Sequence, residues 1–221
     1  MKLSPADSAP AAPAPPAALG AGHLPRRTAS AGLSWLLIAA GLLGLVAAFV
    51  LTVEKIALLS DPNYVPSCSI NPVLSCGSVM ITPQAEVFRF PNPLIGIVAF
   101  TVVLATGMAL RAGATLARWY WLGLQIGLTA GIVFVHWLIF QSLYRIGALC
   151  PYCMVVWAVT IPLFWYVTLH NTRTGHLHLP SGARRAVDTL AAYHGVVLTG
   201  WYLLVTALIA VRFWTYWSTL L

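Results

Sequence analysis

The sequence predicts an all-α integral membrane protein, and its composition and the spacing of its charges support this fold class. Of its 221 residues, 59% are hydrophobic and 8% are charged, whereas an ordinary soluble domain carries about a quarter charged residues. The mean hydropathy is +0.83. These values exclude a water-soluble globule. Several membrane spans of about 20 apolar residues each would also leave no room for a large extramembrane domain.

Five uncharged windows predict five transmembrane helices. Each window is at least 21 residues long, which is enough to cross a hydrocarbon core of about 30 Å as a helix. A helix satisfies its own backbone hydrogen bonds in lipid. The windows cover residues 28–53, 90–110, 119–144, 146–169 and 189–211. The third and fourth windows nearly touch at Arg145, so the turn between them must be short.

The basic residues predict the orientation of these helices. Twelve Lys and Arg against five Asp and Glu give a net charge of +7; in a membrane protein this surplus indicates topology, and we expect no nucleic-acid partner. With the N-terminus in the cytoplasm, that side receives eight basic residues and the outside four. Aromatic residues at 119–121 and 214–217 match the interfacial ends of the third and fifth spans.

The chain divides into a tail, a core and a fifth span. Residues 1–33 are rich in Ala and Pro, and we expect a disordered cytoplasmic tail. A signal peptide is the alternative, but the apolar run that follows is too long for a cleaved segment. We expect a core over residues 34–170 with an outer loop over 54–91, a cytoplasmic loop over 171–188, and a fifth transmembrane segment over 189–221. The charged residues that border the outer loop, Glu54, Lys55 and Asp61, are expected only to mark the interface.

All four cysteines are predicted to lie on one side of the membrane. Cys68 and Cys76 fall between the first and second spans, and Cys150 and Cys153 fall where the third span leads into the fourth. Both loops are on the same face, which the predicted topology assigns to the outside, where disulfides persist. The four sulfurs are therefore able to meet.

The second cysteine pair opens an apolar helix as Cys150-Pro151-Tyr152-Cys153. Proline is favoured at the first helical position, because its missing N–H would be unpaired there anyway. Cys150 is then close to the N-cap, where the helix dipole lowers the pKa of a thiol. The spacing suits a redox-active disulfide.

Two other readings of the cysteines remain open. Structural disulfides could staple the outer loop, although the chain has little other outside mass to staple. A four-cysteine zinc site fits by count, but a Cys-x7-Cys paired with a Cys-x-x-Cys is an unusual ligand spacing, and an oxidising compartment opposes it. We predict a redox relay and no metal.

The cysteines and one further motif resemble a known family. Cys68-x7-Cys76, then Asn92-Pro93-Leu94-Ile95-Gly96, then Cys150-x-x-Cys153 look like the vitamin K epoxide reductase family, particularly its bacterial members, over about residues 34–170. The resemblance implies a four-helix bundle that encloses a quinone of the menaquinone or ubiquinone type. It also implies that Cys68 and Cys76 are the shuttle pair, that Cys150 and Cys153 are the active-site pair with Cys153 nearest the quinone ring, and that Asn92 hydrogen-bonds a quinone oxygen.

The chain departs from the family pattern at two positions. Thr82 stands where the family often has a serine thought to assist the active site, and the hydroxyl is kept. Trp157 stands where vertebrate members have a tyrosine facing the quinone, which weakens the expectation of vitamin K epoxide chemistry. Trp157 is one turn inward of Cys153, so we expect it to line a quinone pocket; packing against the bundle or lipid is the alternative.

Two polar residues near or inside the spans have a competing structural role. His136 is ionisable and intramembrane, which makes it a candidate for protonating the quinone, with a hydrogen bond to a neighbouring helix as the alternative. The alternative for Asn92 is capping of the second span ahead of Pro93.

The expected function is that of a thiol oxidoreductase in a bacterial inner (cytoplasmic) membrane. It would reoxidise a DsbA-like thioredoxin-fold partner and pass the electrons through both cysteine pairs to the quinone pool, which supports disulfide formation in exported proteins. Many bacterial members carry a thioredoxin-like domain after a fifth helix; this chain ends at Leu221, so we expect a separate partner. The alternative class is a non-catalytic scaffold or transporter with a disulfide-stapled outer loop.

Overall fold

The fold is a bundle of membrane-spanning helices. The computed structural model describes residues 30–61, 63–177 and 180–219, in which an isolated bridge is the only β-structure. Five helical segments in this part of the chain are long and apolar enough to cross a membrane. They are α1 (Ala31–Ser60), α3 (Pro93–Arg111), α4 (Arg118–Gln141) with the π-helical turn η2 (Ser142–Ile146), α5 (Pro151–Arg173) and α7 (His194–Arg212). The predicted all-α membrane fold with five spans is confirmed.

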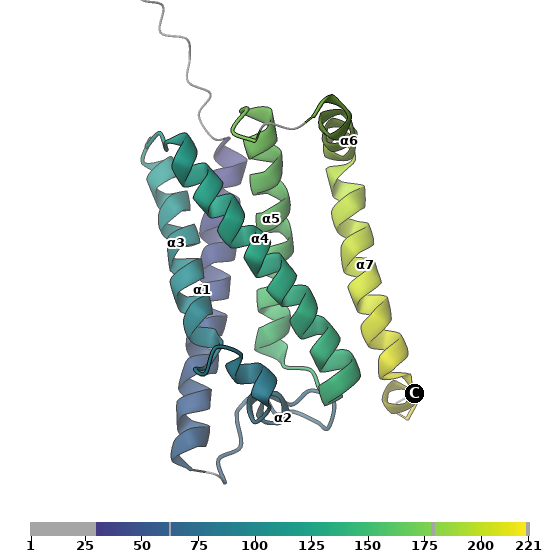
Figure 1. The fold of residues 1–221 in the computed structure, drawn as a ribbon. Coiled ribbons are helices and arrows are strands. Elements are labelled where there is room, and N and C mark those ends of the chain that lie inside the picture. The colour runs from purple at the N-terminus through teal and green to yellow at the C-terminus, as the bar shows by residue number, and fades with distance from the viewer. Residues whose placement is uncertain (1–29, 62, 178–179, 220–221) are drawn as a thin grey trace, which may run out of the picture.

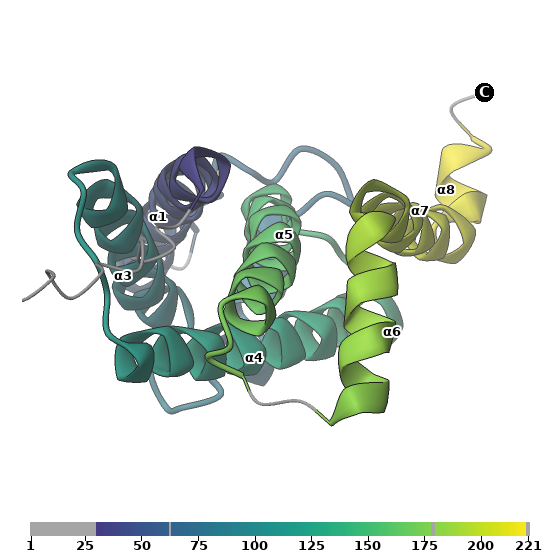
Figure 2. The ribbon, with the colours of Figure 1, turned by 90° about the horizontal axis from the view of Figure 1, so that it is seen from above.

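Four of these helices form the bundle, and the fifth lies at its edge (Figures 1 and 2). Helices α1 and α3 are neighbours, α5 packs on α1, and α4 crosses the bundle obliquely and packs on α5. Their shared core consists of apolar side chains from all four helices. It includes Leu37, Phe100, Leu128, Leu163 and Val167.

Helices α1 and α3 approach each other closely because glycines form their contact. A Cβ atom added to Gly41 would lie 2.8 Å from the backbone nitrogen of Leu104, and one added to Gly107 would lie 2.8 Å from that of Ile38. Small residues permit such close backbone approach between membrane helices, where dispersion contacts drive packing. This contact fixes one wall of the bundle.

Helix α7 is held to the bundle by polar contacts and by a few partly buried apolar side chains, among them Val205, Leu208 and Ile209. The Tyr202 hydroxyl donates to the Ala158 carbonyl at 2.6 Å, and Arg212 Nε donates to the Leu143 carbonyl at 2.7 Å. No residue of α7 is buried in the described chain. Most of its surface is therefore left for lipid.

Several boundaries differ from those expected. Helix α1 begins at Ala31, where the Ser30 hydroxyl caps it by accepting from the Leu33 N–H at 3.3 Å, and it continues to Ser60. The loop between the first two spans therefore starts at Asp61, and within it lie α2 (Cys76–Met80) and the 3₁₀ turn η1 (Pro83–Glu86). The expected tail and the alternative signal peptide fall largely on residues 1–29, outside the described residues.

The expected loop over 171–188 is wrong in one respect, because it contains most of a helix. Helix α6 (Ser181–Ala192) precedes the fifth span, which begins at His194, and a short final helix, α8 (Trp214–Trp217), follows it. Windows drawn from charges alone cannot detect α6, because two arginines and an aspartate interrupt its apolar positions.

The glycine contact gives a testable prediction. Alanine is about 1 kcal/mol better than glycine in a helix interior, so Gly200→Ala should preserve or raise thermal stability, because its new Cβ would have no neighbour within 4 Å among the described residues. Gly107→Ala should instead lower stability by about 1–3 kcal/mol, because the methyl group must push α1 and α3 apart. Thermal unfolding of both variants in the same detergent compares them, and equal shifts would contradict this account of the contact.

Candidate active site

A backbone bridge brings the two cysteine-bearing segments together. The Leu149 N–H donates to the Val73 carbonyl at 2.7 Å, and the Ser75 N–H donates to the Leu149 carbonyl at 2.8 Å. Leu74 and Leu149 thereby form a parallel bridge. Cys76 directly follows Ser75, and Cys150 directly follows Leu149, so the pairing fixes the two cysteines beside each other.

Both of these cysteines stand where a helix begins. Cys76 is the first residue of α2, after Ser75, whose hydroxyl accepts from the Ser78 N–H at 3.2 Å. Cys150 is the N-cap of α5, with Pro151 at the first helical position. The predicted place of Cys150 is confirmed, and the unpaired N–H groups of the first turn of α5 are available to its sulfur.

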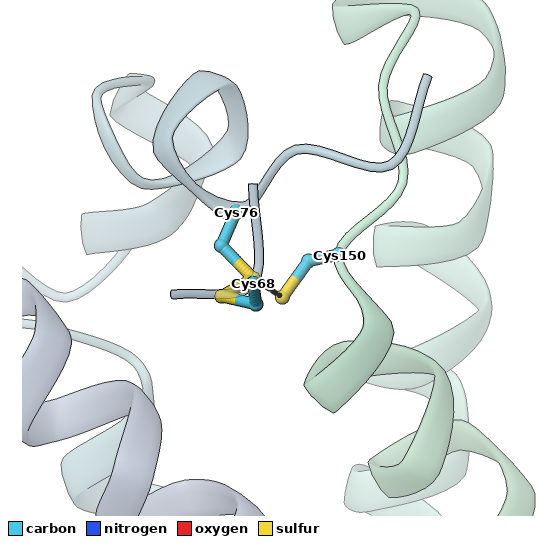
Figure 3. A group of neighbouring side chains, drawn as sticks. All are labelled: Cys68, Cys76 and Cys150. Atoms are coloured by element: carbon cyan, nitrogen blue, oxygen red, sulfur yellow. Dashed lines mark hydrogen bonds between the residues drawn. A yellow bond between two sulfur atoms is a disulfide. The ribbon is translucent and has the colours of Figure 1, made fainter. Parts of the chain in front are cut away.

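Three of the four sulfurs form one buried cluster (Figure 3). Cys68 and Cys76 form a disulfide with their Cα atoms 5.5 Å apart, while Cys150 and Cys153 are free thiols. The Cys150 sulfur lies 3.0 Å from the Cys76 sulfur, and the three sulfurs of Cys68, Cys76 and Cys150 lie within 4.8 Å of one another. Thiol–disulfide exchange between Cys76 and Cys150 therefore requires little movement.

The same cluster has the spacing of a metal site, but its chemistry differs. Cysteine binds zinc as a thiolate. Two of the three sulfurs are already joined to each other in a disulfide, which leaves Cys150 as the single thiol of the cluster. This state of the site suits exchange between sulfurs better than metal ligation.

The surroundings of Cys150 lower the pKa of its thiol. The main cause is a hydrogen bond from the Cys153 side chain, and the backbone N–H groups of Cys153 and Tyr152 act in the same direction, while burial opposes them. Each of these donors favours the thiolate, which is the form that attacks a disulfide. Cys150 is thus prepared to be either the nucleophile or the leaving group.

A cavity of about 520 Å³ extends from these cysteines along the bundle. Cys150 and Cys153 line one end of it, and Trp119 and Tyr120, at the start of α4, line the other. Its wall is predominantly apolar and comes from α1, α3, α4 and α5, and a pocket with these properties is typical of a site for an apolar cofactor.

Comparison with protein families now adds to this geometry. The sequence profile of the vitamin K epoxide reductase family matches residues 35–168, which is more than half of the chain and includes all four cysteines. The chain belongs to the vitamin K epoxide reductase family. No individual curated protein matches it. Family membership makes the protein a multi-pass membrane thiol oxidoreductase, and the four helices inside the matched range are those that enclose the cavity.

Two of the residues that the family resemblance indicated line the cavity. Trp157 is buried there, and its indole Nε1 is a buried donor with no partner among the described residues. Asn92 also lines the cavity, but its amide already bonds within the loop, donating to the Gln84 carbonyl at 2.7 Å and accepting from the Val87 N–H at 3.1 Å. Asn92 is the N-cap residue of α3 ahead of Pro93, as expected, but its side chain makes no capping hydrogen bond. Contact between Asn92 and a quinone stays a prediction.

Neither Thr82, which the family pattern indicated, nor His136, a candidate because it is an ionisable residue inside a span, is among the residues that line the cavity. The Thr82 hydroxyl donates to the Val79 carbonyl at 2.7 Å within the outer loop. His136 lies on the face of α4 toward α7, where its Nε2 accepts from Trp201 Nε1 at 2.9 Å and its Nδ1 lies 2.8 Å from the Ile132 carbonyl. The expected protonation of a quinone by His136 is therefore corrected: both ring nitrogens are engaged, and the hydrogen bond to a neighbouring helix is what the structure has.

The sequence did not reveal the role of Glu54, which anchors the segment before Cys68. Glu54 is buried near the end of α1 and accepts hydrogen bonds from the Tyr64 hydroxyl at 2.8 Å and from both the backbone N–H and the hydroxyl of Ser67. A buried carboxylate needs such partners to offset its lost hydration. The residue before Cys68 is thereby tied to α1.

Lys55 performs the corresponding task for the segment after Cys76. Its Nζ donates to the Met80 carbonyl at 2.8 Å and pairs with Glu86 at 2.8 Å, and its side chain lies along the cavity wall. Both charged residues were expected only to mark the interface. A signal for their role exists in the sequence: two adjacent, opposite charges continue an apolar helix, where charge is costly unless it is paired.

The contact between Cys76 and Cys150 can be tested by trapping. A Cys68→Ser/Cys153→Ser variant keeps only Cys76 and Cys150, and mild oxidation should join them nearly completely, because their sulfurs need to move by only about 1 Å to reach the bond length of a disulfide. Peptide mapping under non-reducing conditions measures the product. The matched control, Cys68→Ser/Cys150→Ser, keeps Cys76 and Cys153 and should form much less disulfide; equal yields from the two variants would contradict the assigned exchange pair.

Proposed function

We propose that this protein takes electrons from the thiols of a separate DsbA-like thioredoxin-fold protein and delivers them to a membrane quinone. The observation that carries the proposal is the position of Cys150, whose sulfur lies 3.0 Å from that of Cys76 and also lines the apolar cavity. One thiol thus touches both the outer disulfide and the cofactor site. A disulfide that only stapled the loop would not need this neighbour.

The exchange begins at the outer pair. A thiolate of the partner attacks the Cys68 sulfur, the Cys68–Cys76 bond breaks, and Cys76 leaves as a thiolate. The partner's second thiol then displaces Cys68, so the partner leaves as a disulfide and the outer pair holds two electrons. Cys68 is 5% exposed and Cys76 is 0% exposed, which supports Cys68 as the sulfur that the partner attacks after the loop opens.

The second exchange passes the electrons inward. The Cys76 thiolate attacks Cys150 of a Cys150–Cys153 disulfide, and Cys153 leaves as a thiolate. Cys68 then attacks Cys76, which restores the Cys68–Cys76 disulfide and releases Cys150. The resulting state has an outer disulfide and two inner thiols, and these are the bonds of the described structure.

The cavity residues fit a quinone. A bound quinone would accept the two electrons together with two protons. The thiols of Cys150 and Cys153, which both line the cavity, would supply these electrons and protons and would be joined again as the Cys150–Cys153 disulfide, with Cys153 as the sulfur next to the quinone. The Trp157 indole N–H, which has no partner in the described part of the chain, would hydrogen-bond a quinone oxygen. An unpaired buried donor is costly without such an acceptor.

The shape of the cavity favours a quinone with an isoprenoid tail, of the menaquinone or ubiquinone type. Gly123, Gly127 and Gly131 line it at every fourth position of α4. A Cβ added to Gly123 or Gly127 would meet no described atom within 4 Å, and one at Gly131 would meet only Thr160 Cγ2 at 3.8 Å. Unlike the glycines of α1 and α3, these glycines do not serve close helix packing; they leave room along the cavity for an apolar chain.

The expected location is a bacterial cytoplasmic membrane, with the cysteines outside. Arg111, Arg118 and Arg173 stand at the ends of the spans opposite the cysteines. The positive-inside rule assigns that end to the cytoplasm. The oxidising side would then hold the disulfide.

The proposed relay predicts that oxidation of the partner and reduction of the quinone can be separated by mutation. In nanodiscs with a reduced DsbA-like protein and a ubiquinone, Cys153→Ser should lose quinone reduction by more than about a thousandfold, because the electron donor to the cavity is gone. The same variant should still oxidise about one equivalent of the partner through its intact outer disulfide. Quinone absorbance and partner alkylation measure the two halves. Full turnover in Cys153→Ser, or an inert outer disulfide in the unaltered protein, would overturn the proposal; the latter is the behaviour of a stapled scaffold or transporter.

The glycine-lined wall predicts a dependence on tail length. Gly127→Leu should raise KM for a long-tail quinone about tenfold, the equivalent of about 1.4 kcal/mol, and should leave KM for a tail-less quinone unchanged. Gly200→Leu on α7, where an added Cβ would have no close neighbour in the described chain, is the matched control. An equal effect of Gly127→Leu on both quinones would place the tail elsewhere.

A further inference from the structure

A second hollow, of about 720 Å³, lies at the end of the bundle opposite the cysteines. Its lining comes from the end of α3, the start of α4, the end of α5, the turn after α5, and α6. We call it the basic hollow, after the side chains that distinguish it from the central cavity. They are the arginines Arg118, Arg173 and Arg184, and two histidines, His170 and His176, line the hollow as well.

The charge of the basic hollow is of one sign. No Asp or Glu is among its described lining residues. Glu54, Asp61 and Glu86 are at the cysteine end of the bundle, and Asp188 on α6 is the one acidic residue of the chain after Glu86. The arginines among these lining residues therefore favour an anionic ligand.

A polar network gives one wall of the basic hollow a fixed shape. Asn171 is 0% exposed and donates to the Trp121 carbonyl at 3.2 Å, while the ring of His170 lies against that of Trp121 with centroids 4.2 Å apart. Arg118 Nε donates to the His176 carbonyl at 3.1 Å. This wall of the hollow is therefore formed by hydrogen-bonded and stacked side chains, while the arginines Arg118, Arg173 and Arg184 are exposed.

Helix α6 places the basic hollow at the level of lipid headgroups. The helix is seen end-on in Figure 1 and along its length in Figure 2, so it lies across the ends of the spans. Arg184 lines the hollow, and on the same helix Leu190 remains 44% exposed. An amphipathic helix in this orientation is typical of the membrane interface.

We propose that the basic hollow binds the phosphate group of an anionic phospholipid. Guanidinium groups bind phosphate through paired, charge-assisted hydrogen bonds. The hollow opens at the interface, on the side that the positive-inside rule assigns to the cytoplasm, where anionic lipids attract basic residues. A free phosphate ion offers the same chemistry, and the experiment distinguishes the two sources. The site is separate from the cysteine relay.

The experiment uses the full chain in nanodiscs. Arg173→Gln and Arg184→Gln should each weaken retention of phosphatidylglycerol about fivefold, because each removes a charge-assisted hydrogen bond to the bound phosphate. The double variant should weaken it about 25-fold. Arg185→Gln removes the same charge from the neighbouring position of α6, which is not among the described lining residues, and it should have little effect. Native mass spectrometry of bound lipid is the readout.

Three further arms make the outcome decisive. Arg173→Lys should recover part of the binding, and an unchanged unfolding temperature in phosphatidylcholine nanodiscs confirms that the variants fold. Inorganic phosphate added to the protein in phosphatidylcholine nanodiscs tests whether the free ion binds. If the unaltered protein binds phosphate and the double variant does not, the site binds phosphate but its ligand is the free ion. Retention of phosphatidylglycerol that is equal in all variants, with no phosphate binding, would overturn the proposal. Alkylation of the four cysteines, measured in the same variants, shows separately whether the cysteine relay is intact.

Discussion

The pairing of residues 73–75 with Leu149 is the interaction on which the active site depends. It joins two segments that are far apart in the sequence and sets Cys76 and Cys150 at neighbouring helix starts. The first turn of α5 then supplies N–H groups to Cys150 and places Cys153 on the cavity wall. Without this register, the sulfurs would lie on the same face of the membrane but out of reach of each other.

The outer loop keeps Cys76 beside Cys150 because α1 anchors both the segment before Cys68 and the segment after Cys76. Glu54 anchors the segment before Cys68 and Lys55 the segment after Cys76. Neighbouring positions on a helix point in different directions, so one turn of α1 can serve both limbs. The close contact of α1 with α3, made through glycines, gives these anchors a firm base. Helix α1 thus links the position of the outer loop to the packing of the bundle.

The sequence predicted what depends on composition and local order: five spans, the N-cap position of Cys150, and the family. It did not predict what depends on helix rotation or long-range pairing. His136 was weighed as a quinone ligand, yet the rotation of α4 turns it toward Trp201. The Asn92 side chain was expected to hydrogen-bond a quinone or to cap a helix, yet its amide forms hydrogen bonds within the outer loop. Glu54 and Lys55 were treated as interface markers because their partners are 10 to 31 residues away.

The burial of the sulfur cluster also has a consequence for selectivity. Cys76 and Cys150 are 0% and 1% exposed, so small dissolved thiols and oxidants have no direct access to the inner exchange. Under the proposed function, a partner protein would have to displace the outer loop to reach these sulfurs. In the proposed relay, this burial would keep the oxidising power of the quinone away from other thiols and make it available only to a protein that fits the outer loop.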